Sequence, residues 1–113
     1  MKKVNWVANS RAIVSGFPSA VRDQIGFDLY QAQLGTIGRC SKPMRGLGGG
    51  VMEIAVSDAA GTFRTVYTVS IGDAIYVIDA FQKKSKTGIA TPRLDIERIR
   101  QRLKRLREEL ENG

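Results

Sequence analysis

Residues 51–81 read VMEIAVSDAAGTFRTVYTVSIGDAIYVIDAF, and this stretch decides the fold. It holds three runs rich in β-branched and aromatic residues, 51–57, 62–71 and 74–81, a composition typical of strands. The turn-like residues 58–61 and the pair Gly72-Asp73 separate the three runs. Because connections this short join neighbouring antiparallel strands, the sequence predicts a three-stranded meander.

Helical periodicity is found on both sides of the meander. Before it, Pro18 suits a first helical turn and Gly35 suits a helix end. The apolar residues between them recur at helical spacing, as Val21, Ile25, Leu29 and Ala32. After the meander, Thr91 and Pro92 are residue types typical of a helix start. A second apolar stripe then predicts an amphipathic helix to about residue 111, through Ile96, Ile99, Leu103, Leu106 and Leu110.

The remaining segments complete one domain. Residues 4–8 (VNWVA) predict a short first strand, residues 10–17 a short helix, and the glycine-rich residues 39–50 (RCSKPMRGLGGG) a loop. The chain of 113 residues has the length of a single domain, 1–113. We therefore expect the α+β class, with a small antiparallel β-sheet, helices packed on one face of it, and an amphipathic C-terminal helix.

The composition excludes several chemistries. The chain has no histidine, which rules out a Ser-His-Asp triad, a histidine-dependent ribonuclease and a histidine-ligated metal site. The single cysteine, Cys40, rules out a disulfide framework or a CxxC motif and fits a reducing cytosol. No apolar run approaches the roughly 20 residues of a transmembrane helix, and the N-terminus lacks the apolar stretch of a signal peptide. We expect a cytoplasmic protein with no metal, no cofactor and no membrane partner.

The charge is strongly positive and unevenly distributed. Eighteen Lys and Arg against 11 Asp and Glu give a net charge of +7, which suggests a polyanionic partner. Ten of the basic residues lie between positions 83 and 107, where only Asp95 and Glu97 are acidic. A solvated helix face accounts for much of this surplus. The cluster Lys83, Lys84 and Lys86 is different, because it directly follows a predicted strand that would hold it in place.

Strand alternation singles out Arg64. Phe63 and Tyr67 would share one face of the sheet, and Arg64 would point to the other. If the aromatic face packs against helices, Arg64 emerges on the open face of the sheet. In the next strand Gln82 and Lys84 share a parity and would emerge beside one another. A guanidinium held there is suited to bidentate phosphate binding. The alternative is an ordinary ion pair between Arg64 and Glu53 of the neighbouring strand.

Four segments follow one another in a characteristic order. They are KPMRGLGGGVMEIAV (42–56), GTFRTVYTV (61–69), IYVIDAFQKKSKT (75–87) and TPRLDIERIRQRL (91–103). Together they resemble the RelE/HigB superfamily of type II toxins, and within it the phage-derived HigB-like branch. The resemblance implies a RelE-like fold and a metal-independent endoribonuclease that cleaves messenger RNA on the ribosome, inhibiting translation and growth. It also implies a cognate helix-turn-helix antitoxin that neutralises the toxin in a hetero-oligomeric complex.

The resemblance also implies site residues. Arg64 matches the family's mid-strand arginine, Lys84 the basic residue after the last strand, and Arg45 the basic residue of the loop before the sheet. Further candidates for contact with RNA are Lys42, Lys86 and Tyr67. The chain departs from the family where some members carry lysines on the second strand as candidate bases, since Glu53 and Ala55 occupy those positions. It also lacks the C-terminal tyrosine or histidine of some members.

Metal-free RNA cleavage needs a base for the 2′-hydroxyl, a cation for the phosphorane and an acid for the leaving oxygen. Arg64 is the candidate for phosphate stabilisation, and Lys84 or Lys83 the candidate for the acid. The base is either Glu53 or a lysine whose pKa is lowered by cationic neighbours.

Two other functions fit the same observations. ParE-like relatives on this scaffold poison DNA gyrase and do not cleave RNA, and the fold alone does not separate the two activities. A non-catalytic phage protein that binds nucleic acid through its basic C-terminal half is the other possibility. Such a protein would show salt-sensitive binding without cleavage products.

Overall fold

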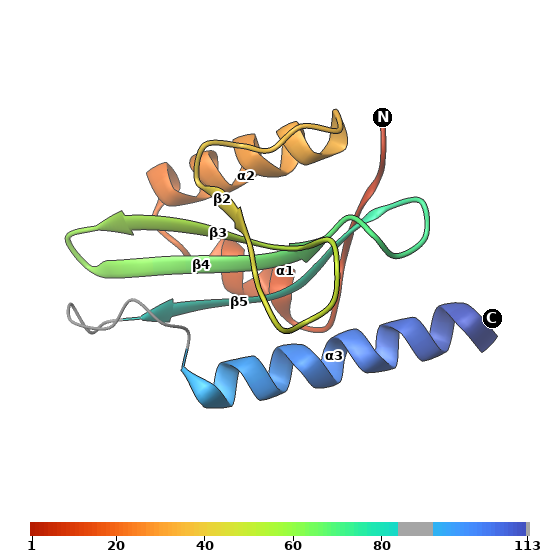
Figure 1. Ribbon diagram of the computed structural model, residues 1–113. Helices are drawn as coiled ribbons and strands as arrows, with labels where there is room; N and C mark the ends of the chain where they lie inside the picture. The colour runs from red at the N-terminus through yellow and green to blue at the C-terminus, as the bar shows by residue number, and fades with distance from the viewer. Residues whose placement is uncertain (84–91, 113) are drawn as a thin grey trace.

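The structure is a computed structural model that describes residues 1–83 and 92–112. The elements in chain order are β1 (Val4–Trp6), α1 (Ser10–Ser15), α2 (Ser19–Gln33), β2 (Ser41–Pro43), β3 (Val51–Asp58), β4 (Gly61–Thr68), β5 (Ile75–Lys83) and α3 (Arg93–Asn112). The five strands form one sheet in the order β1-β5-β4-β3-β2 (Figure 1). The α+β class is confirmed. Within the described residues, none of the helices has the length and apolarity needed to span a bilayer.

The predicted meander is confirmed, and two further strands extend it. β3, β4 and β5 pair in sequence and antiparallel. β1 pairs with β5 in parallel, which the prediction of an antiparallel sheet did not include. This direction is possible because a long connection through α1 and α2 separates β1 from the meander. β2 lies inside the predicted loop and pairs antiparallel with β3. The sequence analysis missed β2 because three residues are too few to show the alternating pattern of a strand.

The helices lie on both faces of the sheet, not on one face as the sequence suggested. On the first face, here called the α2 face, α1 and α2 pack against a core that includes Val21, Ile25, Leu29, Ile54, Phe63, Tyr67 and Val77. On the second face, the α3 face, α3 packs against a separate core that includes Val51, Val66, Ile78, Ile99, Leu103 and Leu106. Figure 1 shows the resulting three layers, with the sheet between α2 and α3. The central strands are therefore covered from both sides.

An irregularity in β5 explains how α3 is held on the sheet. Val66 lies opposite Asp79 but Tyr67 lies opposite Val77, so Ile78 is an extra residue in the ladder. A bulge of this kind turns two consecutive side chains to one face. Ile78 joins the core beneath α3, and Asp79, which is 1% exposed, faces α3 as well.

Asp79 anchors α3 through two arginines. Its carboxylate accepts hydrogen bonds from Arg98 Nε at 2.7 Å and from Arg102 Nη1 at 2.9 Å. Burial alone would lower the pKa of Arg98, but the hydrogen bonds and negative charges of Asp95 and Asp79 outweigh burial and raise it. Two of the basic residues that the sequence suggested as surface cations therefore form part of the fold.

A second buried carboxylate, Asp28 of α2, holds the start of β2. It is fully buried and accepts hydrogen bonds from Gln24 Nε2 at 2.7 Å, the Cys40 amide at 3.0 Å and Ser41 Oγ at 2.7 Å. Gly38 lies against the same carboxylate, and a Cβ added there would be 2.4 Å from Asp28 Cγ. Position 38 therefore has no room for a side chain.

Gly38→Ala should destabilise the protein by about 1–3 kcal/mol, because the new methyl group would push Asp28 away from its three donors. Gly26→Ala in α2 is the control, since a Cβ added there meets nothing within 4 Å. That variant should stabilise the helix by about 0.5–1 kcal/mol. Urea denaturation followed by circular dichroism measures both. Equal changes in the free energy of unfolding at the two positions would show that the hydrogen bonds accepted by Asp28 do not require a glycine at position 38.

Candidate functional site

Four of the predicted site residues lie on the α3 face of the sheet. Lys42 in β2 is directly opposite Glu53 in β3. In the next two strands Arg64 is directly opposite Phe81, and Lys83 follows two positions after Phe81. Since side chains two apart on a strand share a face, β5 presents Lys83 on the same side of the sheet as Arg64. The structure thus gathers a carboxylate and three cations from four adjacent strands.

Arg64 does not emerge on an open face, which corrects the prediction. It is 4% exposed, and Glu53 is 2% exposed. Arg64 Nη1 lies 2.6 Å from Glu53 Oε1, so the ion pair considered as the alternative is present. Arg64 is directly opposite Ala55, and Glu53 is its diagonal neighbour, within reach of a long side chain. The prediction was wrong because it assumed a sheet with one uncovered face.

The energetics of this pair tie the two side chains to each other. Moving two charges out of water is expensive, and their attraction only offsets that penalty when the geometry is good. Apolar residues of similar volume are often as stabilising as a buried ion pair. Removing only one partner is different, because the remaining buried charge costs about 3–5 kcal/mol. Glu53 and Arg64 are therefore coupled, and each holds the other in a fixed orientation.

The remaining predicted residues are distributed as follows. Lys42 and Arg45 are exposed, in β2 and in the loop after it, and Lys83 at the end of β5 is half-buried. Lys84 and Lys86 lie outside the described residues. Lys42 and Arg45 therefore give the β2 side of the sheet a cationic rim.

Tyr67 is not available for contact with RNA, and that prediction was wrong. Its side chain belongs to the core on the α2 face and is 1% exposed. Burial raises the pKa of Tyr67, a hydrogen bond with Ser41 opposes that shift, and the negative charge of Asp28 adds to it. The phenol is thus a neutral core group on the side of the sheet away from Arg64.

Sequence reasoning missed the two buried carboxylates, Asp28 and Asp79, although each left a signal. Asp28 lies three residues after Ile25 and four before Ala32, so it falls on the apolar stripe of its helix. Asp79 interrupts the apolar run IYVIDAF. A carboxylate in such a position needs a buried partner.

Fold and site together define a small basic domain in which a β-sheet, covered on both faces, buries one arginine against one glutamate. The chain belongs to the family described as phage derived protein Gp49-like (DUF891), whose model matches residues 13–104. This is a family of RelE/HigB-like toxins, so the resemblance at the level of the superfamily is confirmed, and the HigB branch stays a prediction. No curated protein matches the chain.

Proposed function

We propose that this protein is the toxin of a type II toxin–antitoxin system, a metal-independent endoribonuclease that cleaves messenger RNA on the ribosome in the cytoplasm. The observation that carries the proposal is the 2.6 Å contact between Glu53 and Arg64 on the face that also bears Lys42 and Lys83. Membership in a toxin family supports it. A cognate antitoxin, expected to be a helix-turn-helix protein, would neutralise the activity.

The contact supplies two of the three groups that the reaction needs. Glu53 accepts the proton of the ribose 2′-hydroxyl as the 2′-oxygen forms its bond to phosphorus. Arg64, next to that carboxylate, neutralises the charge that develops on the phosphorane oxygens. The bond from phosphorus to the 5′-oxygen then breaks, and a lysine ammonium, Lys83 or Lys84, gives a proton to the leaving oxygen. The products are a 2′,3′-cyclic phosphate and a 5′-hydroxyl.

The burial of the pair bears on where the reaction takes place. A guanidinium that is 4% exposed meets a phosphate only after the atoms that cover it have moved. A substrate held rigidly beside the protein lowers the cost of such an opening, because the contacts it gains offset the contacts that are lost. We therefore expect slow cleavage of free RNA and much faster cleavage of messenger RNA held in a ribosome.

The experiment compares a defined messenger RNA, free and in a translating extract, with cleavage sites mapped by primer extension. We expect cuts within codons and 5′-hydroxyl ends. The cleavage rate should be at least tenfold higher with ribosomes, which corresponds to an activation free energy lower by about 1.4 kcal/mol. Lys42→Ala should slow the reaction without unfolding the protein, because Lys42 is exposed. Lys104→Ala, an equally exposed change on α3, is the control.

Two outcomes would overturn the proposal. Breaks in plasmid DNA that depend on gyrase, with intact messenger RNA, would favour the ParE-like activity. Salt-sensitive RNA binding without cleavage products would favour the non-catalytic binding protein.

A further inference from the structure

β1 forms one edge of the sheet, and no strand in the described residues pairs with its outer side. The carbonyl of Lys3 and the amide of Val7 bond to β5, at 2.8 and 2.9 Å. In a parallel ladder alternate residues bond to the same neighbour, so the amides and carbonyls of Val4 and Trp6 point outward. An edge with free backbone groups is a template for another strand. Here we call these outward-pointing groups the β1 edge.

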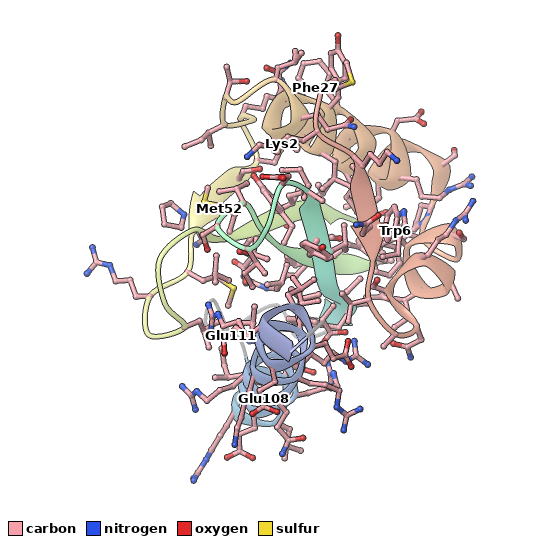
Figure 2. The ribbon with its side chains drawn as sticks, turned by 90° about the vertical axis from the view of Figure 1, so that its right-hand side faces the viewer. Lys2, Trp6, Phe27, Met52, Glu108 and Glu111 are labelled. Atoms are coloured by element: carbon pink, nitrogen blue, oxygen red, sulfur yellow. The ribbon has the colours of Figure 1, made fainter. Side chains whose placement is uncertain are left out.

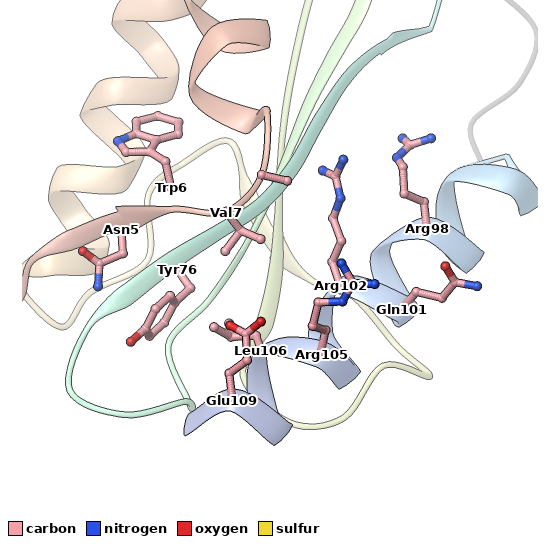
Figure 3. Close-up of a pocket in the computed structure, with 11 residues that line it drawn as sticks. Asn5, Trp6, Val7, Tyr76, Arg98, Gln101, Arg102, Arg105, Leu106 and Glu109 are labelled. Carbon is pink, nitrogen blue, oxygen red and sulfur yellow. The ribbon is translucent and has the colours of Figure 1, made fainter. Parts of the chain in front are cut away.

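The β1 edge lies between two grooves, one on each face of the sheet. The groove on the α3 face has a volume of about 620 Å³, with Asn5 and Tyr76 on the sheet side and Arg105 on the α3 side (Figure 3). The groove on the α2 face has a volume of about 200 Å³ and is lined by Trp6, Arg11 and Arg22. Figure 2 shows Trp6 at the margin of the sheet, between α2 above and α3 below. A strand added to β1 would have its side chains in both grooves.

The charge of the two grooves is positive. Arg11, Arg22 and Arg105 are exposed, and none of them takes part in an ion pair within the described part of the chain. Among the residues that line the grooves Glu109 is acidic, and it lies in the groove with Arg105. Because arginines flank the β1 edge on both faces, two copies of this chain meeting edge to edge would repel each other.

We propose that the β1 edge docks an extended, acidic segment of a second protein, which joins the sheet as a sixth strand. Side chains of an added strand alternate between the two faces, so acidic residues of the segment reach Arg105 on one face and Arg11 and Arg22 on the other. Backbone hydrogen bonds to Val4 and Trp6 supply affinity, and the arginines select an acidic partner. The docking is independent of whether the protein cleaves RNA.

The test uses a capped octapeptide, Thr-Glu-Glu-Thr-Val-Glu-Glu-Thr, which places two glutamates on each face of the strand it would form. Trp6 is the single tryptophan of the chain, so its fluorescence reports binding at the β1 edge directly. We expect saturable binding that weakens with added salt. The same peptide with glutamine in place of glutamate should bind about tenfold more weakly.

Two variants test the backbone and the charge separately. Val4→Pro removes an outward amide and leaves the bonds of Lys3 and Val7 to β5 in place, so it should abolish binding in a folded protein. Val4→Thr keeps the amide and should bind normally. Arg22→Glu/Arg105→Glu should weaken binding about tenfold. The matched reversal Arg100→Glu/Lys104→Glu, outside both grooves, should have a much smaller effect.

A peptide with an N-methyl group on every residue keeps the proposal testable if Val4→Pro fails to fold. It has the same charge, but both of its edges lack amide hydrogens and are blocked by methyl groups, so it should not bind. Equal affinity of the methylated and unmethylated peptides would overturn strand addition. Binding of an oligouridine octamer in preference to either peptide would assign the grooves to nucleic acid. Concentration-dependent dimerisation through Trp6 would assign the edge to a second copy, and each of these results would overturn the proposal.

Discussion

Replacing both members of the buried ion pair, as Glu53→Leu/Arg64→Met, should leave the protein folded and abolish its growth inhibition. Apolar residues of similar volume avoid the desolvation penalty, so the free energy of unfolding should be unchanged or higher by about 1–4 kcal/mol. Arg64→Ala alone should be less stable by about 3–5 kcal/mol, because it leaves Glu53 charged and buried. Loss of toxicity in the double variant therefore cannot be attributed to unfolding.

Urea denaturation gives the stability of each variant, and induced expression in a bacterial host gives the growth inhibition. The control is Arg93→Ala/Glu97→Ala, which removes an ion pair whose side chains are 91% and 50% exposed. That change should alter stability by less than about 1 kcal/mol and leave growth inhibition intact. Full toxicity in a stable Glu53→Leu/Arg64→Met protein would show that the pair is structural and that catalysis, if present, lies elsewhere.

Asp79→Ala should detach α3 from the sheet. Asp79 is 1% exposed and receives both Arg98 and Arg102, so its removal leaves two guanidinium groups facing a buried site. We expect a loss of about 3 kcal/mol, at the low end for a broken buried pair, because the arginines are partly exposed and can turn to water. Asp95→Ala is the control, since Asp95 contacts the same Arg98 but from the first turn of α3. Its loss should cost about 0.5–1 kcal/mol.

Hydrogen exchange separates local detachment from global loss of stability. In Asp79→Ala the amides of α3, including those of Ile99 and Leu103, should exchange faster than the amides of β4. In Asp95→Ala both regions should keep nearly the wild-type rates. Equal acceleration in α3 and β4 of Asp79→Ala would indicate that α3 and the sheet unfold as one unit.

The elements that sequence analysis predicted well are those fixed by local pattern. The meander follows from β-rich runs with short turns, and α2 and α3 follow from their apolar stripes. β2 was not predicted because its attachment depends on Asp28, which reaches Ser41 across 13 positions of the chain. Alternation could not anticipate β2, since no local pattern encodes this contact.

For the candidate site too, local pattern predicted some features, and the features that depend on distant parts of the chain were missed. Alternation gives the relative orientation of neighbouring side chains, and it correctly turned Arg64 away from Phe63. It does not say whether another element covers that face, so the burial of Arg64 was missed. The bulge at Ile78 also reverses the alternation in β5. Lys83, and not Gln82, shares the face of Arg64, because Gln82 lies opposite Phe63.

The three-layer arrangement has a consequence for how many molecules the protein can hold at once. Since α2 and α3 shield both broad sides of the sheet, strand backbone is accessible to other macromolecules along the two outermost strands, β1 and β2. Four interstrand spacings, about 19 Å in total, separate these margins. Trp6 marks one margin and Lys42 the other. A strand that pairs with the first margin therefore does not compete for the backbone groups of the second.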